Sequence, residues 1–358
     1  MSALHPTSDP GAPPDELRVV GARVEQRITD LLDAEQARWE LVDAGIVAPL
    51  ESLRRLVMAG GKRLRPTFCH WGHVAAGGDP DDIAVVEAGA ALELLQAFAL
   101  VHDDVMDGSA TRRGAPSVHH QFAATHESSG WRGEGRRFGE GVAILVGDLA
   151  HVYADQLLPA GRPDVDEVWH ELRIELNVGQ YLDMVGTAER DVSRTTARRV
   201  ARYKSGKYTI ERPLHLGAAL AGRYHDCAPS LSAYGDPLGE AFQLRDDVLG
   251  VFGESERTGK PVGDDLREGK PTLLLSVATE RCPSADRPLL DRVGAGDLAP
   301  DEVVALQELF VTTGAVAEVE ATIEALTGRA TEAASAIGDR ETQAALTRLA
   351  HFVSQRTA

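Results

Sequence analysis

The sequence predicts an all-α fold, a single large helical bundle around a central cavity. Apolar residues recur at helical spacing through most of the 358 residues. No stretch of useful length alternates apolar and polar side chains as a half-buried strand does, and no repeat of about 20 to 50 residues stands out. Alanine is plentiful and aromatic residues make up only 5%, a composition that suits closely packed helices.

The chain is long for one domain, but an all-helical fold of this size can remain one unit. The first fourteen residues contain four prolines and lack the basic and apolar runs of a signal peptide, so we expect 1–14 to be a disordered tail and 15–358 to be one domain. Apolar spacing predicts helices at 15–43, 49–58, 84–101, 142–158, 165–185, 193–203, 208–221, 231–252 and 272–279, and further amphipathic helices after 298.

Glycine-rich and polar segments are expected to separate these helices. The predicted interruptions are 60–66, 119–141, 204–207, 258–270 and 282–298. Of these, 119–141 is rich in glycine, serine and arginine and is expected to be a loop, which leaves open whether it is a lid. Residues 204–207 are expected to break a helix.

The charge and cysteine content exclude several classes of protein. The net charge is −18, from 37 basic and 55 acidic residues, which disfavours nucleic acid as a general partner. Cys69, Cys227 and Cys282 lie far apart, so a disulfide framework or zinc site is not expected and a reducing cytoplasm fits. The most apolar helix carries two glutamates and is rich in alanine, which favours a protein core over a membrane span.

That apolar helix ends in a cluster of charge. From 84 to 101 its only ionisable side chains are Glu87 and Glu93, and it then leads directly into Asp103, Asp104 and Asp107. Asp103 and Asp107 are four positions apart and share one helix face. Such carboxylates repel one another unless a cation lies between them, and Mg²⁺ held by one or two carboxylates usually binds phosphate oxygens as well. An isolated cluster of this kind is also compatible with a solvated helix end.

A second pair of aspartates, Asp246 and Asp247, closes another apolar helix. If both helices line one cavity, five aspartates meet there, which requires cations because like charges in a partly dry site cost several kcal/mol. Two or three Mg²⁺ ions and a diphosphate would neutralise them. Basic residues in the intervening segments provide further anion contacts: Lys62, Arg65, Arg112, Arg113, Lys204 and Lys260.

Five stretches in order along the chain resemble the signatures of the trans-isoprenyl diphosphate synthases, also called polyprenyl synthetases, and are most like the geranylgeranyl diphosphate synthases. They read GGKRLRP, LVHDDVMDGSATRRG, YKSGKYT, FQLRDDVLG and GKPVGDDLREGK and span about residues 50–275. The resemblance implies an isoprenoid synthase type of helical bundle. It also implies a head-to-tail condensation, in which an allylic diphosphate ionises, isopentenyl diphosphate attacks the carbocation and a proton is lost.

The resemblance assigns roles residue by residue. Asp103 and Asp107 look like Mg²⁺ ligands with Asp104 supporting, and Asp246 looks like the ligand on the facing helix with Asp247 behind it. The allylic diphosphate contacts would be Arg112, Lys204 and Lys260, the isopentenyl diphosphate contacts would be Lys62, Arg65, Gln96 and Arg113, and Ser205 and Gln243 would lie near the reacting carbons. By the same resemblance the released diphosphate accepts the proton. Lys207, Arg63, Asp264, Asp265 and Lys270 are more simply interpreted as loop ion pairs or supporting groups.

Two positions depart from the family pattern. Gln96 stands where many members carry histidine, and glutamine can still donate a hydrogen bond. The second aspartate motif usually ends in a third aspartate, and here that position is Gly250. The absence of the third aspartate would weaken one metal site if that carboxylate binds the metal directly. It would matter little if the carboxylate only supports another metal ligand.

Chain length in this family depends on residues just before the first aspartate motif. Phe98 lies five positions before Asp103 and Ala99 four positions before it. An aromatic followed by a small residue resembles the pattern of geranylgeranyl diphosphate synthases, which implies a C20 product made from dimethylallyl, geranyl or farnesyl diphosphate. A C15 or longer product stays an alternative.

Two other functions remain open from sequence. A terpene cyclase also pairs aspartates with Mg²⁺ and diphosphate, but would not need GGKRLRP or the paired arginines after the first motif. Gly250 is also compatible with a catalytically weak or regulatory subunit of a heteromeric synthase. The resemblance alone implies a homodimer.

Overall fold

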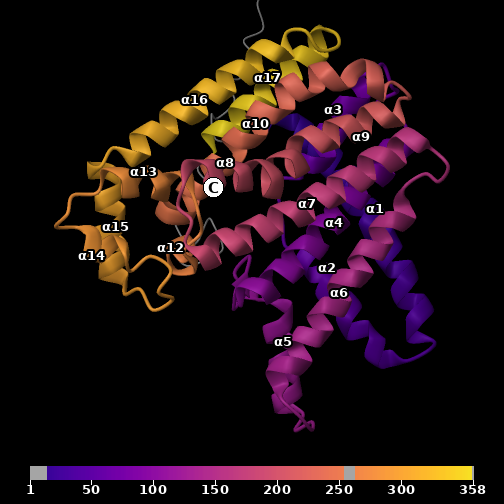
Figure 1. Cartoon of the computed structure of the whole chain (residues 1–358). Helices are drawn as coiled ribbons and strands as arrows, with labels where there is room; N and C mark the ends of the chain where they lie inside the picture. The colour runs from indigo at the N-terminus through magenta and orange to yellow at the C-terminus, as the bar shows by residue number, and fades with distance from the viewer. Residues whose placement is uncertain (1–13, 254–262, 357–358) are drawn as a thin grey trace, which may run out of the picture.

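The computed structural model describes residues 14–253 and 263–356 and confirms the all-α prediction (Figure 1). The first half contains α1 Asp15–Glu40, the 3₁₀ turn η1 Ala44–Ile46, α2 Val47–Met58, α3 Leu64–Ala75, α4 Ile83–Asp107, α5 Val118–Ser128, α6 Gly135–Leu157 and α7 Pro163–Glu189. The second half contains α8 Arg194–Val200, η2 Ala201–Glu211, α9 Arg212–Leu220, α10 Tyr224–Phe252, α12 Asp264–Glu268, α13 Leu273–Arg281, α14 Arg287–Leu290, α15 Pro300–Thr312, α16 Ala315–Ala334 and α17 Arg340–Gln355. The expected tail lies almost entirely outside the described residues.

Helix α4 forms the centre of the largest apolar core. Asp82 caps its start by accepting a hydrogen bond from the Ala84 amide. Most of its side chains are buried against α1, α3 and α6. It is long and apolar enough to cross a membrane, but 61% of its apolar window is buried inside the fold, as in the core helix of a soluble protein. A membrane span is therefore not indicated by α4.

The prediction of a loop at 119–141 is wrong. Most of that segment belongs to α5 and to the first turns of α6, and only residues 129–134 connect the two helices. Two of its glycines, Gly135 and Gly139, serve close packing. A Cβ at Gly139 would lie 2.1 Å from the carbonyl oxygen of His119, so glycine lets the two helices touch. In the sequence, a glycine needed for helix packing therefore looked the same as a glycine in a loop.

The prediction of a break at 204–207 is also wrong. The chain continues through this segment as a π-helix, η2, between α8 and α9. Gly206 contacts the α10 backbone, where a Cβ would lie 2.8 Å from the carbonyl carbon of Gly239. Here, too, glycine permits a close helix contact.

Smaller differences between the prediction and the structure concern where helices begin and what lies in the segments that connect them. Helix α10 begins before the predicted 231 and includes Pro229 and Pro237 within its length. Two short strands, β1 Thr111–Arg112 and β2 Ala115–Pro116, pair in an antiparallel hairpin just after α4. The expected linker 282–298 contains the single turn α14. Figure 1 shows α16 and α17 along one side of the bundle, next to α10.

Candidate active site

The first aspartate cluster lies at the carboxyl end of α4, which Gly108 terminates with a φ of 68°. Asp103 lines a cavity of about 850 Å³. Asp107, one turn further on, has a buried Oδ2 that accepts no hydrogen bond from the described residues and lies 3.4 Å from the ammonium of Lys270. Asp104 is 1% exposed and accepts a hydrogen bond of 2.8 Å from Arg112 Nε. Asp104 therefore holds Arg112 in place from behind.

The second aspartate cluster lies near the end of α10. Asp246 lines the same cavity and pairs with Arg356, whose Nη2 lies 2.7 Å from its Oδ1. Asp247 also lines the cavity and accepts a hydrogen bond of 2.7 Å from Gln243 Nε2. Asp247 is buried, whereas the side chain of Asp246 is 40% exposed.

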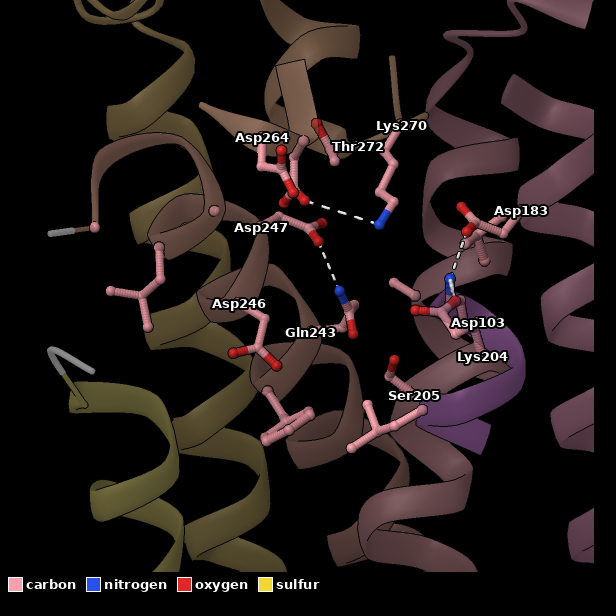
Figure 2. A pocket seen from close by; sticks show the side chains of 18 of the residues that line it. Asp103, Asp183, Lys204, Ser205, Gln243, Asp246, Asp247, Asp264, Lys270 and Thr272 are labelled. Carbon is pink, nitrogen blue, oxygen red and sulfur yellow. Dashed lines mark hydrogen bonds and ion pairs between the residues drawn. The ribbon is translucent and has the colours of Figure 1, made fainter. Parts of the chain in front are cut away.

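The two clusters meet across one cavity. Figure 2 shows Asp103 and Lys204 on one side, and Asp246, Asp247 and Gln243 on the other. Segments that are more than one hundred residues apart thus supply carboxylates to the same space. The arrangement needs positive charge, since the carboxylates would otherwise repel one another in a partly dry site.

Protein cations provide part of that charge. The ammonium of Lys204 lies 2.5 Å from Asp183 Oδ2 and 3.2 Å from Asp103 Oδ1. Arg112 Nη2 donates to Asp103 Oδ2 at 3.2 Å. Burial alone would lower the pKa of each cation, but Asp104 and Asp103 raise the pKa of Arg112, and Asp103 and Asp183 raise the pKa of Lys204, so both stay charged. In the same cavity Ser205 lies next to Lys204.

A second group of polar side chains lines another part of the cavity. It comprises Lys62, Arg65, Gln96 and Arg113, all of which the sequence analysis assigned to one diphosphate. Arg113 donates a hydrogen bond of 2.8 Å to the Leu56 carbonyl oxygen. Gly60 and Gly61 adopt positive φ angles of 97° and 146°, so the loop before α3 uses conformations that favour glycine.

Arg63 of the same loop has a different role. Its guanidinium is buried, pairs with Glu93 and Glu25, and donates to the Val57 carbonyl oxygen at 2.7 Å. It does not line the cavity. Of the three cations in GGKRLRP, one therefore fixes the loop and two face the ligand space.

Three further residues of the cavity, Asp183, Lys270 and Arg356, have no ligand role in the sequence analysis. Asp183 continues the buried stripe of α7 and could have been found as a carboxylate at a core position. Lys270 pairs with Asp107, Asp265 and Glu268, as expected of a supporting ion pair. Arg356 reaches the cavity only because α17 folds back over α10, and no local sequence signal marks it.

The space beside Gly250, which stands in place of the third aspartate of the second motif, is filled by Asp265. A Cβ at position 250 would lie 1.9 Å from Asp265 Oδ2. A carboxylate from the segment after the second motif therefore occupies the space beside Gly250. The cavity keeps an acidic group at this edge although the motif lacks its third aspartate.

Burial and charge shift the titration of the carboxylates in opposite directions. Burial alone would raise the pKa of Asp103, but Lys204, Lys270 and Arg112 lower it below its usual range. Burial and the neighbouring Asp103 charge raise the pKa of Asp107. Burial raises the pKa of Asp247 to about 8, so this carboxyl is protonated at neutral pH unless a cation binds near it.

The donor set fits Mg²⁺ that is shared with a phosphate-bearing ligand. Among the described residues no group of three carboxylate, imidazole or thiol side chains is arranged to hold a metal by itself. Mg²⁺ commonly binds through one or two carboxylates and completes its shell with water and phosphate oxygens. The buried Oδ2 of Asp107 accepts no hydrogen bond from the described residues and is paired with the Lys270 ammonium at 3.4 Å, so a metal there would take the place of that cation.

Five predicted site residues are not among the described residues that line this cavity: Asp104, Asp107, Phe98, Ala99 and Lys260. Asp104 is buried behind Arg112 and Asp107 pairs with Lys270, so three of the five motif aspartates line the cavity instead of all five. Lys260 lies outside the described residues.

Phe98 and Ala99 lie on α4 but face its core contacts with the first half of the chain. Phe98 stacks against His151 of α6, with ring centroids 4.9 Å apart, and contacts His102 at 4.6 Å. On the cavity side α4 presents Gln96 and Leu100.

Comparisons with known proteins agree with this geometry. The family model described as polyprenyl synthetase matches residues 49–310. A short chain isoprenyl diphosphate synthase from Methanothermobacter thermautotrophicus is 30% identical over 337 residues, which cover 90% of this chain and 94% of that protein. Other relatives are named farnesyl, geranylgeranyl, geranylfarnesyl and nonaprenyl diphosphate synthase.

Two solved structures share the fold over almost the whole chain. A geranylgeranyl pyrophosphate synthase from Corynebacterium glutamicum, complexed with isoprenyl diphosphate and magnesium, is 37% identical with a TM-score of 0.90 and covers 95% of this chain and 99% of its own. A polyprenyl synthase from Caulobacter crescentus, complexed with calcium and isoprenyl diphosphate, is 26% identical with a TM-score of 0.81 and covers 98% and 100%.

Proposed function

Because the chain belongs to the polyprenyl synthetase family, whose members are prenyl-transferring trans-polyprenyl diphosphate synthases, we propose that it condenses isopentenyl diphosphate with an allylic diphosphate to give geranylgeranyl diphosphate. The observation that carries the proposal is the convergence of Asp103 and Asp246 on one cavity that also holds two groups of cations. The names of the relatives cover several product lengths, so the C20 product rests on this chain's own residues.

The allylic diphosphate binds where the two aspartate helices face each other. Lys204 and Arg112 contact its oxygens and neutralise the charge that develops as the carbon–oxygen bond breaks. Fixed cations in a site shielded from water stabilise such a leaving group strongly, because they need no reorganisation during the reaction. Lys260 would add a further contact, as the family motif implies.

The isopentenyl diphosphate binds to Lys62, Arg65 and Arg113, with Gln96 as a hydrogen-bond donor. This site uses protein cations and needs no metal. Ser205 and Gln243 line the same cavity and would orient the reacting carbons. The released diphosphate accepts the proton that the new carbocation loses, so no side chain is assigned as the base.

Mg²⁺ is the expected cofactor, with two to three ions per site. Asp103 and Asp107 would hold it on α4, Asp246 would hold it on α10, and Asp104 and Asp247 would support those ligands. When bound, the metal polarises the diphosphate and favours its departure. The magnesium and calcium in the two related structures support the choice of a divalent cation.

Phe98 and Ala99 support the C20 product. The tail is proposed to grow along α4 from Asp103, and one turn and a half of helix corresponds to roughly 8 Å. Phe98 stacks on His151, which is itself held by Arg173 at 3.1 Å. Phe98 and Ala99 do not line the described cavity, so the tail would have to pass between α4 and α6 to reach them, where this stacked pair would close its path and the small side chain of Ala99 would leave room.

The absence of the third aspartate does not favour a regulatory subunit. The carboxylate of Asp265 occupies the space beside Gly250, so the acidic edge of the cavity is kept. A terpene cyclase binds one diphosphate and would leave the Lys62, Arg65 and Arg113 group without a ligand. A prenyl synthase uses both groups of cations.

The chain is further proposed to form a homodimer and to act in the cytoplasm on soluble diphosphates. Large apolar side chains are exposed on adjacent helices α6 and α7: Ile144, Leu145, Val152, Ile174, Val178 and Tyr181. A second copy would cover this surface, as the family resemblance implies. Light scattering should give twice the chain mass of 38.3 kDa, and Leu145→Glu should shift the protein towards monomer.

Product chromatography tests the function. The purified protein is incubated with Mg²⁺, isopentenyl diphosphate and, separately, dimethylallyl, geranyl or farnesyl diphosphate. A dominant C20 diphosphate supports the proposal, whereas dominant C15 or C30-and-longer chains overturn the product assignment. Absence of any extension would indicate the subunit function, and a cyclic hydrocarbon would indicate a cyclase.

A further inference from the structure

The π-helical segment η2 connects the two proposed diphosphate sites. On its cavity side it carries Lys204 and Ser205. A few residues later, Thr209 accepts a hydrogen bond of 2.8 Å from Arg65 Nη2, and the Arg65 guanidinium lies 4.3 Å from the centre of the Tyr208 ring. One segment therefore carries a cation of the first site and holds a cation of the second.

A π-helix is a rare conformation that persists where its surroundings fix it. Three glycines on neighbouring helices bring backbone against this segment. A Cβ at Gly179 of α7 would lie 2.3 Å from the Lys204 amide nitrogen, and one at Gly239 of α10 would lie 2.6 Å from the Gly206 carbonyl oxygen. A Cβ at Gly235 would lie 2.9 Å from the Glu211 Cα. Close packing thus fixes η2 along its length.

The far side of η2 carries buried charge that the proposed chemistry does not use. Lys207 Nζ lies 3.0 Å from Glu175 Oε1 of α7 and 3.0 Å from Glu211 Oε2. Arg212 makes two hydrogen bonds to Glu175, at 2.6 and 2.9 Å, and Ser232 of α10 donates to Glu211 at 2.7 Å. Two cations and two carboxylates balance, and all four residues are nine-tenths or more buried.

Buried charges of this kind are costly unless each keeps its partner, so they fix relative position more than they add stability. Lys207 and Glu211 are four residues apart on the same segment and both are tied to other helices. Loss of Lys207 would leave two carboxylates facing each other behind the backbone that carries Lys204. One carboxyl would then have to take up a proton or the segment would have to move, and either change alters the contacts that fix η2.

We propose that Lys207, with Glu175 and Glu211, is a positioning residue that anchors η2 and thereby sets Lys204 and Arg65 at the two diphosphate sites. The inference rests on the proposed function. Lys207 touches neither diphosphate and acts through the backbone and through Tyr208 and Thr209. The YKSGKYT motif thus combines a ligand-binding lysine and an anchoring lysine three residues apart.

The test compares Lys207→Met with Lys207→Arg and with Arg27→Met. Arg27 pairs with Glu87 at 2.7 Å between α1 and α4, away from the cavity, and controls for the loss of an ion pair. Isothermal calorimetry with isopentenyl diphosphate and no metal reports the Arg65 site. Steady-state kinetics with Mg²⁺ reports the KM of the allylic substrate, and thermal unfolding reports stability.

Lys207→Met should raise both the Kd for isopentenyl diphosphate and the KM of the allylic substrate by about tenfold. Lys207→Arg should restore both constants to within about threefold of those of the unmodified protein. Arg27→Met should change only the melting temperature. In a Lys204→Ala background, Lys207→Met should have no further effect on the allylic KM. In an Arg65→Ala background it should have none on isopentenyl diphosphate binding. If Lys207→Met does not fold, Glu211→Gln carries the same comparison.

The inference would be overturned if Lys207→Met lowered the melting temperature but left both the Kd for isopentenyl diphosphate and the allylic KM unchanged. It would also be overturned if the effects of Lys207→Met on these constants added fully to those of Lys204→Ala and Arg65→Ala. Failure of the proposed function would look different. In that case the unmodified protein would form no prenyl diphosphate, while calorimetry with isopentenyl diphosphate would still report whether Lys207 positions Arg65.

Discussion

Asp265 lies against Gly250 so closely that a Cβ at position 250 would come within 1.9 Å of its Oδ2. Gly250 ends the second aspartate motif on α10, and Asp265 lies on α12, beyond the segment that follows α10. The two residues are complementary, because the small one leaves the room that the acidic one fills. The motif and the segment after it should therefore be considered together.

Restoring the third aspartate should harm the enzyme. Gly250→Asp would place a second carboxylate against Asp265 and displace it, so we expect at least a tenfold loss of kcat and a higher Mg²⁺ requirement. Gly250→Ala should show part of the effect, because the Cβ alone meets Asp265. Mg²⁺ titrations of activity and of thermal stability measure both. Gly328→Ala on α16, where a Cβ meets nothing within 4 Å, is the matched control. Greater activity or tighter Mg²⁺ binding in Gly250→Asp would contradict this explanation.

The affinity for isopentenyl diphosphate should fall as the pH rises. Burial and the positive charge of Arg356 lower the pKa of Lys62 to about 8. The charged ammonium, which is proposed to bind diphosphate, predominates below that pKa and is lost above it, so affinity should be full near pH 7 and decline towards pH 9. Calorimetry without metal measures this. Lys62→Arg should remove the decline, since a guanidinium stays charged. The same pH dependence in both proteins would show that another group titrates.

Arg356 should compete with metal at Asp246. Its guanidinium pairs with that carboxylate, donates to the Phe242 carbonyl oxygen at 2.8 Å and lies 4.1 Å from the Phe242 ring centre. Arg356→Met should therefore lower the Mg²⁺ concentration needed for half-maximal thermal stabilisation by a few fold. It should also raise the pKa of Lys62, because one of the neighbouring positive charges is gone. A Mg²⁺ requirement that rises in this variant would show that Arg356 assists the metal instead.

Product length should respond to the stacked pair of Phe98 and His151. Phe98→Ala should lengthen the product beyond C20, and Ala99→Phe should shorten it towards C15, because each changes the room beside α4. His151→Ala should also lengthen the product by removing the support of the Phe98 ring. Chromatography of the dephosphorylated products measures all three. Unchanged product length in both Phe98→Ala and His151→Ala would place the limit of the tail elsewhere.

The helices and the two aspartate motifs could be predicted from sequence because their signals are local. Apolar spacing identifies α4 and α10, and adjacent carboxylates at their ends require a cation wherever the helices meet. Gly139 and Gly206 misled the prediction for a physical reason. A glycine that opens a loop and a glycine that lets two helices touch look the same until the partner helix is known.

The remaining site residues depend on tertiary structure. Arg356 reaches Asp246 through the return of α17 over α10, which no local pattern indicates. Asp183 belongs to a buried stripe and becomes notable only when Lys204 is seen beside it. The anchoring role of Lys207 likewise requires Glu175, which lies on another helix.

The most direct test of the central claim is to locate divalent cations by anomalous diffraction from crystals soaked with Mn²⁺ and an unreactive thiolo analogue of farnesyl diphosphate. We predict metal peaks between the α4 carboxylates Asp103 and Asp107 and the α10 carboxylate Asp246, bridged by the diphosphate group. Metal bound at only one of the two helices, or a diphosphate seated away from both, would contradict the account.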